Sequence, residues 1–228
     1  MARKTALIVG ASRGIGLGLA REFADRGWDV TATVRGPDSA GELKKLGNGT
    51  VRIETVDTAG ASSGEALRER LDGEVFDLVL VNAGVGGPRS NPRTVTDPEF
   101  NQLMVTNALG PVRLAELLAK QVKPKTGVVA LMTSQLGSVA NNVAGGMELY
   151  RASKAALNSL TRSFAARHKE AGLAVLSLHP GWVRTDMGGA GADIDVETSA
   201  KGLADVVERA AADRRSGFFD YKGDELPW

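Results

Sequence analysis

Short apolar runs rich in β-branched residues alternate along this chain with segments that have the spacing of amphipathic helices. We expect strands at Thr5–Val9, Trp28–Val34, Val51–Val56, Phe76–Val81, Gly127–Thr133 and Leu173–His179. The expected helices are Ile15–Arg26, Ser39–Leu46, Ser63–Leu71, Pro98–Val122, Glu148–Ala171 and Val196–Ala212. Parallel neighbours need a crossover connection, and strands that are apolar throughout need helices on both faces. The alternation therefore predicts an α/β fold with a doubly wound parallel sheet covered by helices on both faces.

Nothing in the sequence divides the chain into parts, because there is no Pro/Gly/Ser-rich linker and no repeat of fixed period. We therefore expect residues 1–228 to form a single domain. Glycine and proline gather instead after expected strands, at Gly84–Pro88, Pro180-Gly181 and Gly188–Gly191. Ligands of open parallel sheets bind at the carboxyl ends of the strands, so these loops should border one pocket.

Composition excludes several classes of function. The chain has 28 Lys+Arg and 27 Asp+Glu, a net charge of +1, and no run of like charges, so we expect no nucleic-acid partner. It has no cysteine, which excludes disulfides and thiolate chemistry, and its two histidines, His168 and His179, are too few for a histidine-built metal site. The apolar run near the N-terminus is too short for a signal peptide or a membrane span, so we expect a cytoplasmic protein without a bound metal.

A glycine-rich loop, Gly-Ala-Ser-Arg-Gly-Ile-Gly at Gly10–Gly16, joins the first expected strand to the first expected helix. Gly10 permits a tight turn, Gly14 lets the backbone approach phosphates, and Gly16 lets the helix pack against the sheet. The free N–H groups at the helix N-terminus favour a pyrophosphate. The alternative is a tight turn without a ligand, but the position between strand and helix favours a dinucleotide in a Rossmann-type fold.

The end of the second expected strand bears on which dinucleotide binds. Proteins that use NAD place an acidic residue there for the ribose 2′-hydroxyl, whereas this chain has Arg35 and no acid before Asp38. Arg35 and Arg13 could both face a 2′-phosphate, which favours NADP(H) over NAD(H). The alternative for Arg35 is a solvated loop residue. Asp57, after the third expected strand, could accept a hydrogen bond from the adenine amine, although an ordinary strand-end aspartate would look the same.

Tyr150 and Lys154 open an expected helix and lie one turn apart on one face. Protonating a developing alkoxide near neutral pH requires a weak acid, and a nearby cation lowers the pKa of a phenol from about 10. A Tyr-x-x-x-Lys spacing by itself is common on helix surfaces, so its significance depends on the other motifs.

These motifs together, in this order, resemble the classical short-chain dehydrogenase/reductase family over essentially the whole chain. The elements that carry the resemblance are Gly10–Gly16, Val-Asn-Ala-Gly at Val81–Gly84, Asn107, Ser134, Tyr150 with Lys154, and Pro-Gly-Trp-Val-Arg-Thr at Pro180–Thr185. The resemblance implies that Ser134 binds the substrate oxygen, Tyr150 is the acid/base, Lys154 tunes it and binds ribose, and Asn107 fixes a water in a proton relay. The cofactor-binding residues it implies, with those argued above, are Gly10, Ser12, Arg13, Gly14, Ile15, Gly16, Arg35, Asp57, Asn82, Ala83, Gly84, Tyr150, Lys154, Pro180, Gly181, Val183 and Thr185.

The sequence departs from the family pattern at several points. Val9 and Val81 replace the usual threonine and asparagine, which should change supporting hydrogen bonds and leave cofactor binding intact. The connection from Ser134 to Tyr150 is longer than usual, and Ser138 within it is a rival for the serine role. This connection, with Gly145–Asn158, His179–Gly189 and the terminal Gly217–Trp228, resembles the C-factor/sniffer branch, which is associated with carbonyl reduction and, in some members, with signalling.

The sequence therefore predicts an NADP(H)-dependent oxidoreductase that reduces a small aldehyde or ketone, with Tyr150 as the proton donor. The alternatives are a dinucleotide-binding signalling protein and an NAD-dependent alcohol dehydrogenase. Family resemblance implies a homodimer or homotetramer formed through the helices around Pro111–Val122 and Glu148–Ala171. The aromatic residues of the C-terminal tail would close over the pocket, pack between subunits or simply be buried.

Overall fold

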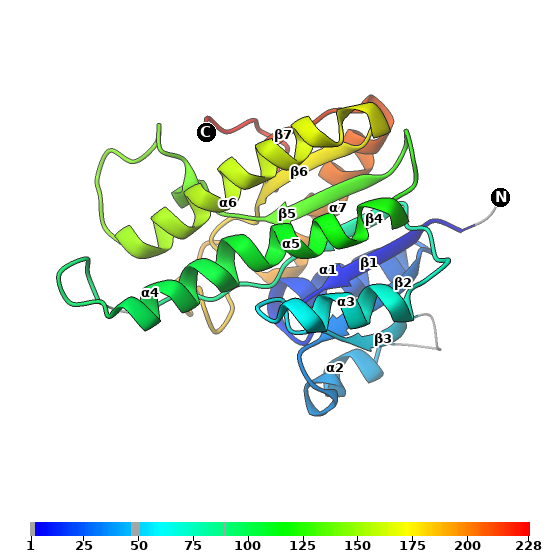
Figure 1. Ribbon diagram of the computed structural model, residues 1–228, viewed down its shortest axis with the longest axis horizontal. Coiled ribbons are helices and arrows are strands. Elements are labelled where there is room, and N and C mark those ends of the chain that lie inside the picture. Colours follow the sequence, from blue (N-terminus) through cyan, green and yellow to red (C-terminus); the bar gives the residue numbers. More distant parts are fainter. Residues whose placement is uncertain (1–2, 47–50, 89) are drawn as a thin grey trace.

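The computed structural model of the protein describes residues 3–46, 51–88 and 90–228 (Figure 1). Its centre is a seven-stranded parallel sheet in the order β3-β2-β1-β4-β5-β6-β7. The strands are β1 Thr5–Val9, β2 Asp29–Val34, β3 Val51–Thr55, β4 Leu78–Val81, β5 Val128–Met132, β6 Ala174–His179 and β7 Gly217–Asp220. The predicted doubly wound parallel sheet is confirmed.

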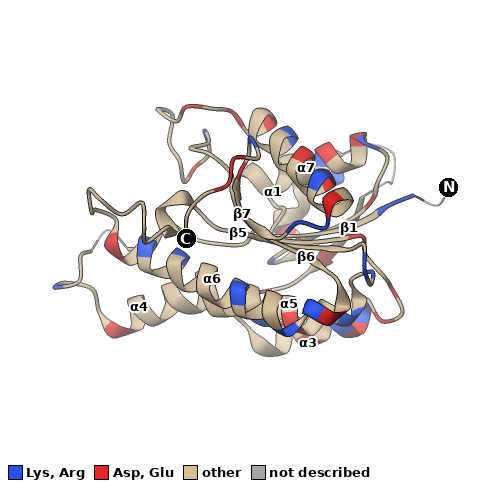
Figure 2. Ribbon diagram, turned by 90° about the horizontal axis from the view of Figure 1, so that it is seen from above, with Lys and Arg blue, Asp and Glu red and all other residues tan. Residues whose placement is uncertain are grey.

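Helices cover both faces of this sheet, which Figure 2 shows edge-on with α1 and α7 on one side and α3, α5 and α6 on the other. The helices are α1 Gly14–Asp25, α2 Gly41–Lys44, α3 Ala61–Arg70, α4 Asp97–Met104, α5 Gly110–Leu118, α6 Glu148–Arg167 and α7 Val196–Asp213. Along β1, Ala6 and Ile8 face the core under α1 and α7, whereas Leu7 and Val9 face the core under α3, α5 and α6. The strand is apolar throughout because alternate residues enter two different cores.

The helix expected over Pro98–Val122 forms as one continuous helical segment, but it is not α-helical throughout. A π-helical stretch, Val105–Leu109, separates α4 from α5, and Gly110 N–H donates to the Val105 carbonyl five residues back. Pro111 has no amide hydrogen, so a regular helical bond cannot form there. Gly110 also lets this helix pack closely against the loop between β3 and α3, because a Cβ on Gly110 would lie 2.2 Å from the Thr58 carbonyl oxygen.

Two further segments differ from expectation. The helix expected over Ser39–Leu46 forms only in part, because a 3₁₀ turn, Pro37–Ala40, leads into a single turn of α-helix, α2, which ends before Lys45. The C-terminal segment contributes β7, which pairs in parallel with β6 and which the sequence did not predict as a strand. β7 spans only Gly217–Asp220, too short a run for alternation to reveal.

Within the described residues, no helix is long and apolar enough to cross a membrane. The cytoplasmic location stays a prediction.

Candidate active site

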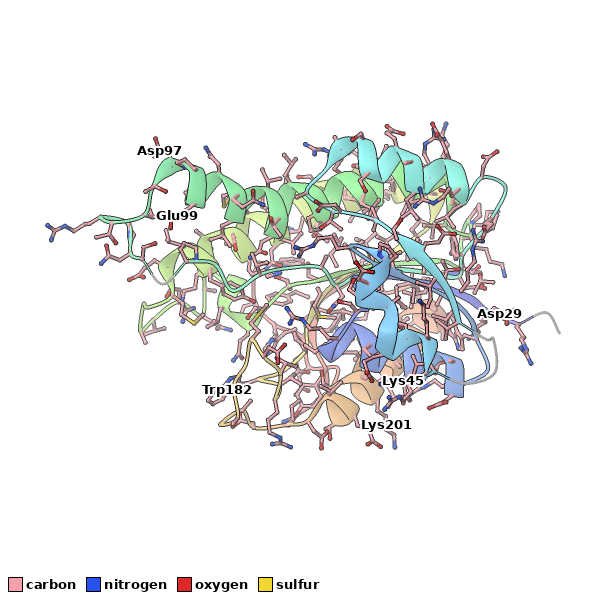
Figure 3. The ribbon with its side chains drawn as sticks, turned by 90° about the horizontal axis from the view of Figure 1, so that it is seen from below. Asp29, Lys45, Asp97, Glu99, Trp182 and Lys201 are labelled. Atoms are coloured by element: carbon pink, nitrogen blue, oxygen red, sulfur yellow. The ribbon has the colours of Figure 1, made fainter. Side chains whose placement is uncertain are left out.

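The carboxyl ends of β1, β4, β5 and β6 bring most of the expected site residues to one end of the sheet (Figure 1). The glycine loop follows β1, Asn82 follows β4, Ser134 follows β5 and Pro180 follows β6. Figure 3 shows this polarity, because Trp182, in the loop after β6, lies at the opposite end of the molecule from Asp29, the first residue of β2.

The glycine loop has a conformation that only glycine adopts without strain. Gly10 and Gly14 have φ of 82° and 55°, in the left-handed region. A Cβ on Gly16 would lie 2.1 Å from the Gly10 carbonyl oxygen, so Gly16 is required by close packing. Ser12 and Arg13 complete the turn before α1, whose first turn, from Gly14, contains no acidic side chain. The N-terminus of α1 therefore keeps its attraction for an anion.

Two side chains hold this loop in shape. Asn82 donates from Nδ2 to the Gly10 carbonyl oxygen (3.0 Å), and Gly10 N–H donates to Thr33 Oγ1 (3.2 Å). Ala83 packs directly beside Gly10, where an added Cβ would lie 3.0 Å from the Ala83 nitrogen. Asn82 was expected to contact the cofactor. In the structure its side chain stabilises the glycine loop. Thr33 was missed, although a polar residue just before the end of an apolar strand was a usable signal.

The start of α6 places Tyr150 and Lys154 on one face, as their spacing predicts. Lys154 is 3% exposed, and its Nζ lies 5.9 Å from the centre of the Tyr150 ring. Nζ also donates to the carbonyl oxygen of Met132, the last residue of β5 (2.9 Å). The ammonium group is thus held beside the phenol at the carboxyl end of the sheet.

Burial shifts the pKa of both groups. It lowers the pKa of Lys154 to about 8, because the charged form loses its hydration. It also raises the pKa of the Tyr150 phenol, an effect that a side-chain hydrogen bond with Ser134 partly offsets. Burial is the larger of these two influences on Tyr150, and the lowering of its pKa by Lys154 stays a prediction.

The pKa of Lys154 leads to a prediction about stability. The folded protein, with a pKa near 8, binds fewer protons between pH 8 and 10.5 than the unfolded chain, whose lysine keeps a pKa of 10.5, so the free energy of unfolding rises over that range. Below pH 8 both states bind the proton and this contribution is constant. This increase in the free energy of unfolding is about 3 kcal/mol at most, and we expect Lys154→Met to remove it. Urea unfolding of the wild type and the variant at pH 7 and pH 10 measures the difference. The same pH dependence in both proteins would contradict the prediction.

Ser134 is better placed than Ser138 for the serine role. It lies two residues beyond the end of β5, is buried, and its hydroxyl hydrogen-bonds the Tyr150 side chain. Its Oγ also accepts from Leu136 N–H (3.1 Å), which fixes the start of the next turn. Ser138 instead accepts from Asn141 N–H (3.1 Å) and supports the following loop.

Asn107 lies in the π-helical stretch and is fully buried. Its side chain exchanges two hydrogen bonds of 2.8 Å with the backbone of Val85, in the loop after β4. Nδ2 also donates to Ser153 Oγ (3.1 Å), and Ser153 donates to the Tyr150 carbonyl oxygen (2.8 Å). Both amide hydrogens are therefore used in bracing, and the relay water stays a prediction. Ser153 was missed, although its place three residues after Tyr150 puts it on the same face.

The loop after β6 lies across the glycine loop. Thr185 contacts Gly14, since its Cγ2 is 3.4 Å from where a Cβ on Gly14 would be, and Val183 is buried with 3% exposed. Arg13 Nη1 and Asp186 Oδ2 pair at 2.8 Å across the same gap, with both side chains exposed. Asp186 was not predicted to lie near the site.

Pro180 and Gly181 fix the path of the loop after β6. Gly181 has φ of 85°, and a Cβ there would lie 2.7 Å from Ile194 Cδ1. The Pro180 carbonyl oxygen accepts from Ser199 Oγ (2.7 Å), which ties the loop to α7. Pro180 and Gly181 thus aim the chain toward Val183 and Thr185.

Arg35 and Asp57 lie at the carboxyl ends of β2 and β3, both exposed. The Arg35 side chain makes no hydrogen bond or ion pair with any other residue that the structure describes. One Asp57 carboxylate oxygen accepts from Ala59 N–H (3.0 Å) and shapes the turn. Arg35 is available for an anion, whereas Asp57 already has a structural use.

A doubly wound sheet with a glycine loop and a buried Ser/Tyr/Lys group at its carboxyl end has the arrangement of a dinucleotide-dependent oxidoreductase. The family model described as short chain dehydrogenase matches residues 4–193. The chain belongs to the short-chain dehydrogenase family.

Individual relatives point to one branch of this family. The chain is 37% identical to the C-signal of Myxococcus xanthus over 153 residues, which is 67% of this chain and 92% of that protein. It is 42% identical to a carbonyl reductase from Pseudomonas aeruginosa solved with NADP, with a TM-score of 0.89 and full coverage of both chains. It is 29% identical to the carbonyl reductase Sniffer of Drosophila melanogaster, with a TM-score of 0.92 and full coverage. The predicted C-factor/sniffer branch is confirmed.

Proposed function

We propose that this protein is an NADP(H)-dependent carbonyl reductase that converts an aldehyde or ketone to the alcohol. The observation that carries the proposal is the grouping of Ser134, Tyr150 and Lys154 near the end of β5. Ser134 hydrogen-bonds the Tyr150 side chain, and the buried Lys154 lies beside the Tyr150 ring and donates to the Met132 carbonyl oxygen.

The residues present fit a dinucleotide. Gly10, Gly14 and Gly16 keep the turn before α1 free of side chains, and an added Cβ would meet Ala83 at Gly10 and the Gly10 carbonyl oxygen at Gly16. The backbone N–H groups at the N-terminus of α1 are therefore open to a phosphate. Gly84 lies against Lys154 and Asn107, because a Cβ there would lie 3.3 Å from both Asn107 Oδ1 and Lys154 Nζ, so a side chain at this position would crowd the lysine. We place the nicotinamide ribose near Lys154, with the carboxamide end directed toward Val183 and Thr185.

Charge favours NADP(H) over NAD(H). Arg35 ends β2 where a carboxylate would select NAD, and Arg13 lies in the glycine loop with its guanidinium exposed. The Pseudomonas aeruginosa relative was solved with NADP, which supports the same choice. Asp57 is proposed to contact the adenine amine with the carboxylate oxygen that the turn does not use.

The proposed chemistry divides between cofactor and chain. When bound, NADPH supplies a hydride to the carbonyl carbon and leaves as NADP⁺. Tyr150 donates the phenol proton to the carbonyl oxygen, which completes the alcohol, and regains a proton from solvent. Ser134 donates a hydrogen bond that orients that oxygen, and the Lys154 ammonium stabilises the phenolate left behind. Asn107 and Ser153 hold the first turn of α6 in position.

The proposal is tested by NADPH oxidation across a panel of aldehydes, ketones and quinones. Turnover of at least one carbonyl class, with the alcohol identified as product, is the expected result. NADPH binding without turnover of any of them would remove the support for a reductase and favour the signalling alternative, to which the similarity to C-signal lends weight.

Replacing Arg35 tests cofactor choice. We expect Arg35→Ala to weaken NADPH binding by about tenfold while NADH binding changes little, because one ion pair with the 2′-phosphate is lost. Titration of protein fluorescence with each cofactor measures this. Lys45→Ala is a matched control, since Lys45 is an exposed cation that pairs with Glu42. Unchanged NADPH affinity in Arg35→Ala would assign the arginine to the solvated surface and revive the NAD-dependent alternative.

We further propose that residues 1–228 form one catalytic domain and that two or four copies associate through α5 and α6. Light scattering of the purified protein measures the second point.

A further inference from the structure

Large apolar side chains that remain exposed are concentrated at the candidate site. Among the described residues they are Val75, Leu109, Val139, Val143, Met147, Trp182 and Met187, with exposed fractions from 43% to 92%. Five of the seven lie in two loops at the carboxyl end of the sheet, which we call the arch, Ser138–Met147, and the strap, Trp182–Ile194. Exposed apolar groups gathered in one place mark a binding surface more often than scattered ones do.

The arch is the long connection between β5 and α6, and it projects from the end of the molecule (Figure 1). Every residue from Val139 to Met147 is exposed, and Val143 reaches 92%. The arch is anchored near its start, where Ala140 N–H donates to the Trp228 carbonyl oxygen (3.1 Å). It rejoins α6 three residues before Tyr150, so Met147 lies on the chain beside the proton donor. Its apolar side chains therefore extend the site, although no core residue packs against them.

The strap approaches the site from the other side of the sheet's end. Met187 Cγ lies 3.8 Å from where a Cβ on Gly86 would be, so this side chain reaches the loop after β4. Trp182 is 52% exposed, and its indole N–H donates to the Gly188 carbonyl oxygen (2.8 Å). The ring is thus fixed in orientation while half of its surface stays uncovered, as Figure 3 shows at the edge of the molecule. A fixed, uncovered aromatic surface suits an apolar ligand.

Neither loop offers a cation to an anionic substrate. The arch contains no charged residue. In the strap, Arg184 pairs with Asp195 (3.6 Å) and donates to the carbonyl oxygens of Ala192 and Asp193. The other charges of the strap are negative, Asp186 and Asp193, and Asp186 pairs with Arg13. One cation outside the loops lies against the arch, since Arg151 of α6 donates to the carbonyl oxygens of Gly146 (2.8 Å) and Leu136 (3.5 Å). Within the two loops, a carboxylate or phosphate on the substrate would find no unpaired cation.

We propose that the arch and the strap together bind the part of the substrate that does not react, and that this part is uncharged and apolar, an aryl group or a long alkyl chain. The inference rests on the proposed carbonyl reduction at Tyr150 and names its substrate class. Closing Val143, Met147, Met187 and Trp182 on such a group removes apolar surface from water on both partners. An anionic group of the same size would instead lose its hydration without gaining an unpaired cation from either loop.

Paired substrates of equal reactivity test the proposal. Decanal and benzaldehyde are compared with propanal and 4-carboxybenzaldehyde, each with NADPH. We expect kcat/KM to be at least roughly tenfold higher for decanal than for propanal, and for benzaldehyde than for its carboxylated analogue, because each comparison adds apolar burial or removes an unpaired charge. Equal values, or a preference for the carboxylated aldehyde, would overturn the proposal and leave the reductase function standing. If no carbonyl is reduced, the reductase proposal itself fails.

A double variant, Val143→Ser with Met147→Ser, tests the residues. Both side chains are exposed, so the fold should be preserved, and serine tolerates the left-handed backbone of Met147 no worse than methionine. We expect the KM for decanal to rise about tenfold with little change in kcat, and the values for propanal to stay within about twofold. Val75→Ser is the matched control, because Val75 is 52% exposed in the turn before β4, at the opposite end of the sheet. Equal losses for decanal and propanal, or equal effects of the control, would contradict the assignment.

Discussion

Tyr150→Phe is expected to lower kcat/KM for carbonyl reduction by about 100- to 10,000-fold, the range that positioned general acids supply. The change removes only the phenol oxygen, so the ring still packs at the start of α6 near Lys154. NADPH affinity should change little, because the glycine loop and Lys154 are untouched. Initial rates with NADPH, together with fluorescence titration of the cofactor, separate the two effects.

The chain supplies a matched control for this variant, since Tyr221 is its only other tyrosine. Tyr221 lies beyond β7, outside the Ser134/Lys154 group, so Tyr221→Phe should keep nearly the full rate. If Tyr150→Phe retained more than about a tenth of the wild-type rate, proton donation would have to be assigned elsewhere.

Gly16→Ala is expected to disrupt the cofactor loop. The new methyl group would lie 2.1 Å from the Gly10 carbonyl oxygen and 2.7 Å from Asn82 Nδ2, so the Asn82–Gly10 hydrogen bond must shift. Overpacking of this kind costs about 1–3 kcal/mol of stability. NADPH affinity should fall by at least about tenfold, which corresponds to 1.4 kcal/mol of lost binding. Thermal unfolding and cofactor titration of the folded variant measure both effects.

Gly41→Ala provides the comparison. Gly41 starts α2 with φ of −54°, and an added Cβ meets nothing within 4 Å. Alanine there should be neutral or should stabilise the protein slightly, because it lowers the conformational entropy of the unfolded chain. If Gly16→Ala and Gly41→Ala behaved alike, the glycine loop would have no special packing role.

The sheet was predictable because its information is local. Each apolar run, such as Leu7–Val9 in β1, is short and bounded by turns, and the glycine loop identifies the first strand and helix without any knowledge of the rest. β7 escaped because Gly217–Asp220 is stabilised by pairing with β6 rather than by any pattern of its own. The π-helical stretch escaped although Gly110-Pro111 marks it, since helical spacing continues on both sides of it.

The residues of the candidate site also divide into those that local sequence predicts and those that only the fold brings together. Tyr150, Lys154 and Ser134 were found because helical spacing and strand ends place them, and the structure brings them together. The partners that hold them were not found, since the contact of Asn107 with Val85 joins segments whose approach only the fold decides. Asp186 is a similar case, as its pairing with Arg13 joins the loop after β1 to the loop after β6, far apart in the sequence.

The sign of the Tyr150 pKa shift could not come from sequence either. The spacing to Lys154 indicated a nearby cation, but burial acts in the opposite direction and is larger in the protein alone. How deeply these two side chains are buried depends on what packs against the start of α6, including Gly137, α4 and the stretch Val105–Leu109, and no single segment encodes it.

The most direct test of the central claim follows the hydride itself. The protein is incubated with NADPH deuterated on each face of nicotinamide C4 in turn and with decanal, and the alcohol is analysed by mass spectrometry. The account predicts that deuterium from one face appears on the carbinol carbon, in equal amount to the NADPH consumed, and that Tyr150→Phe nearly abolishes it. Oxidation of NADPH without deuterium in the alcohol, from either face, would contradict direct transfer to the carbonyl at this site.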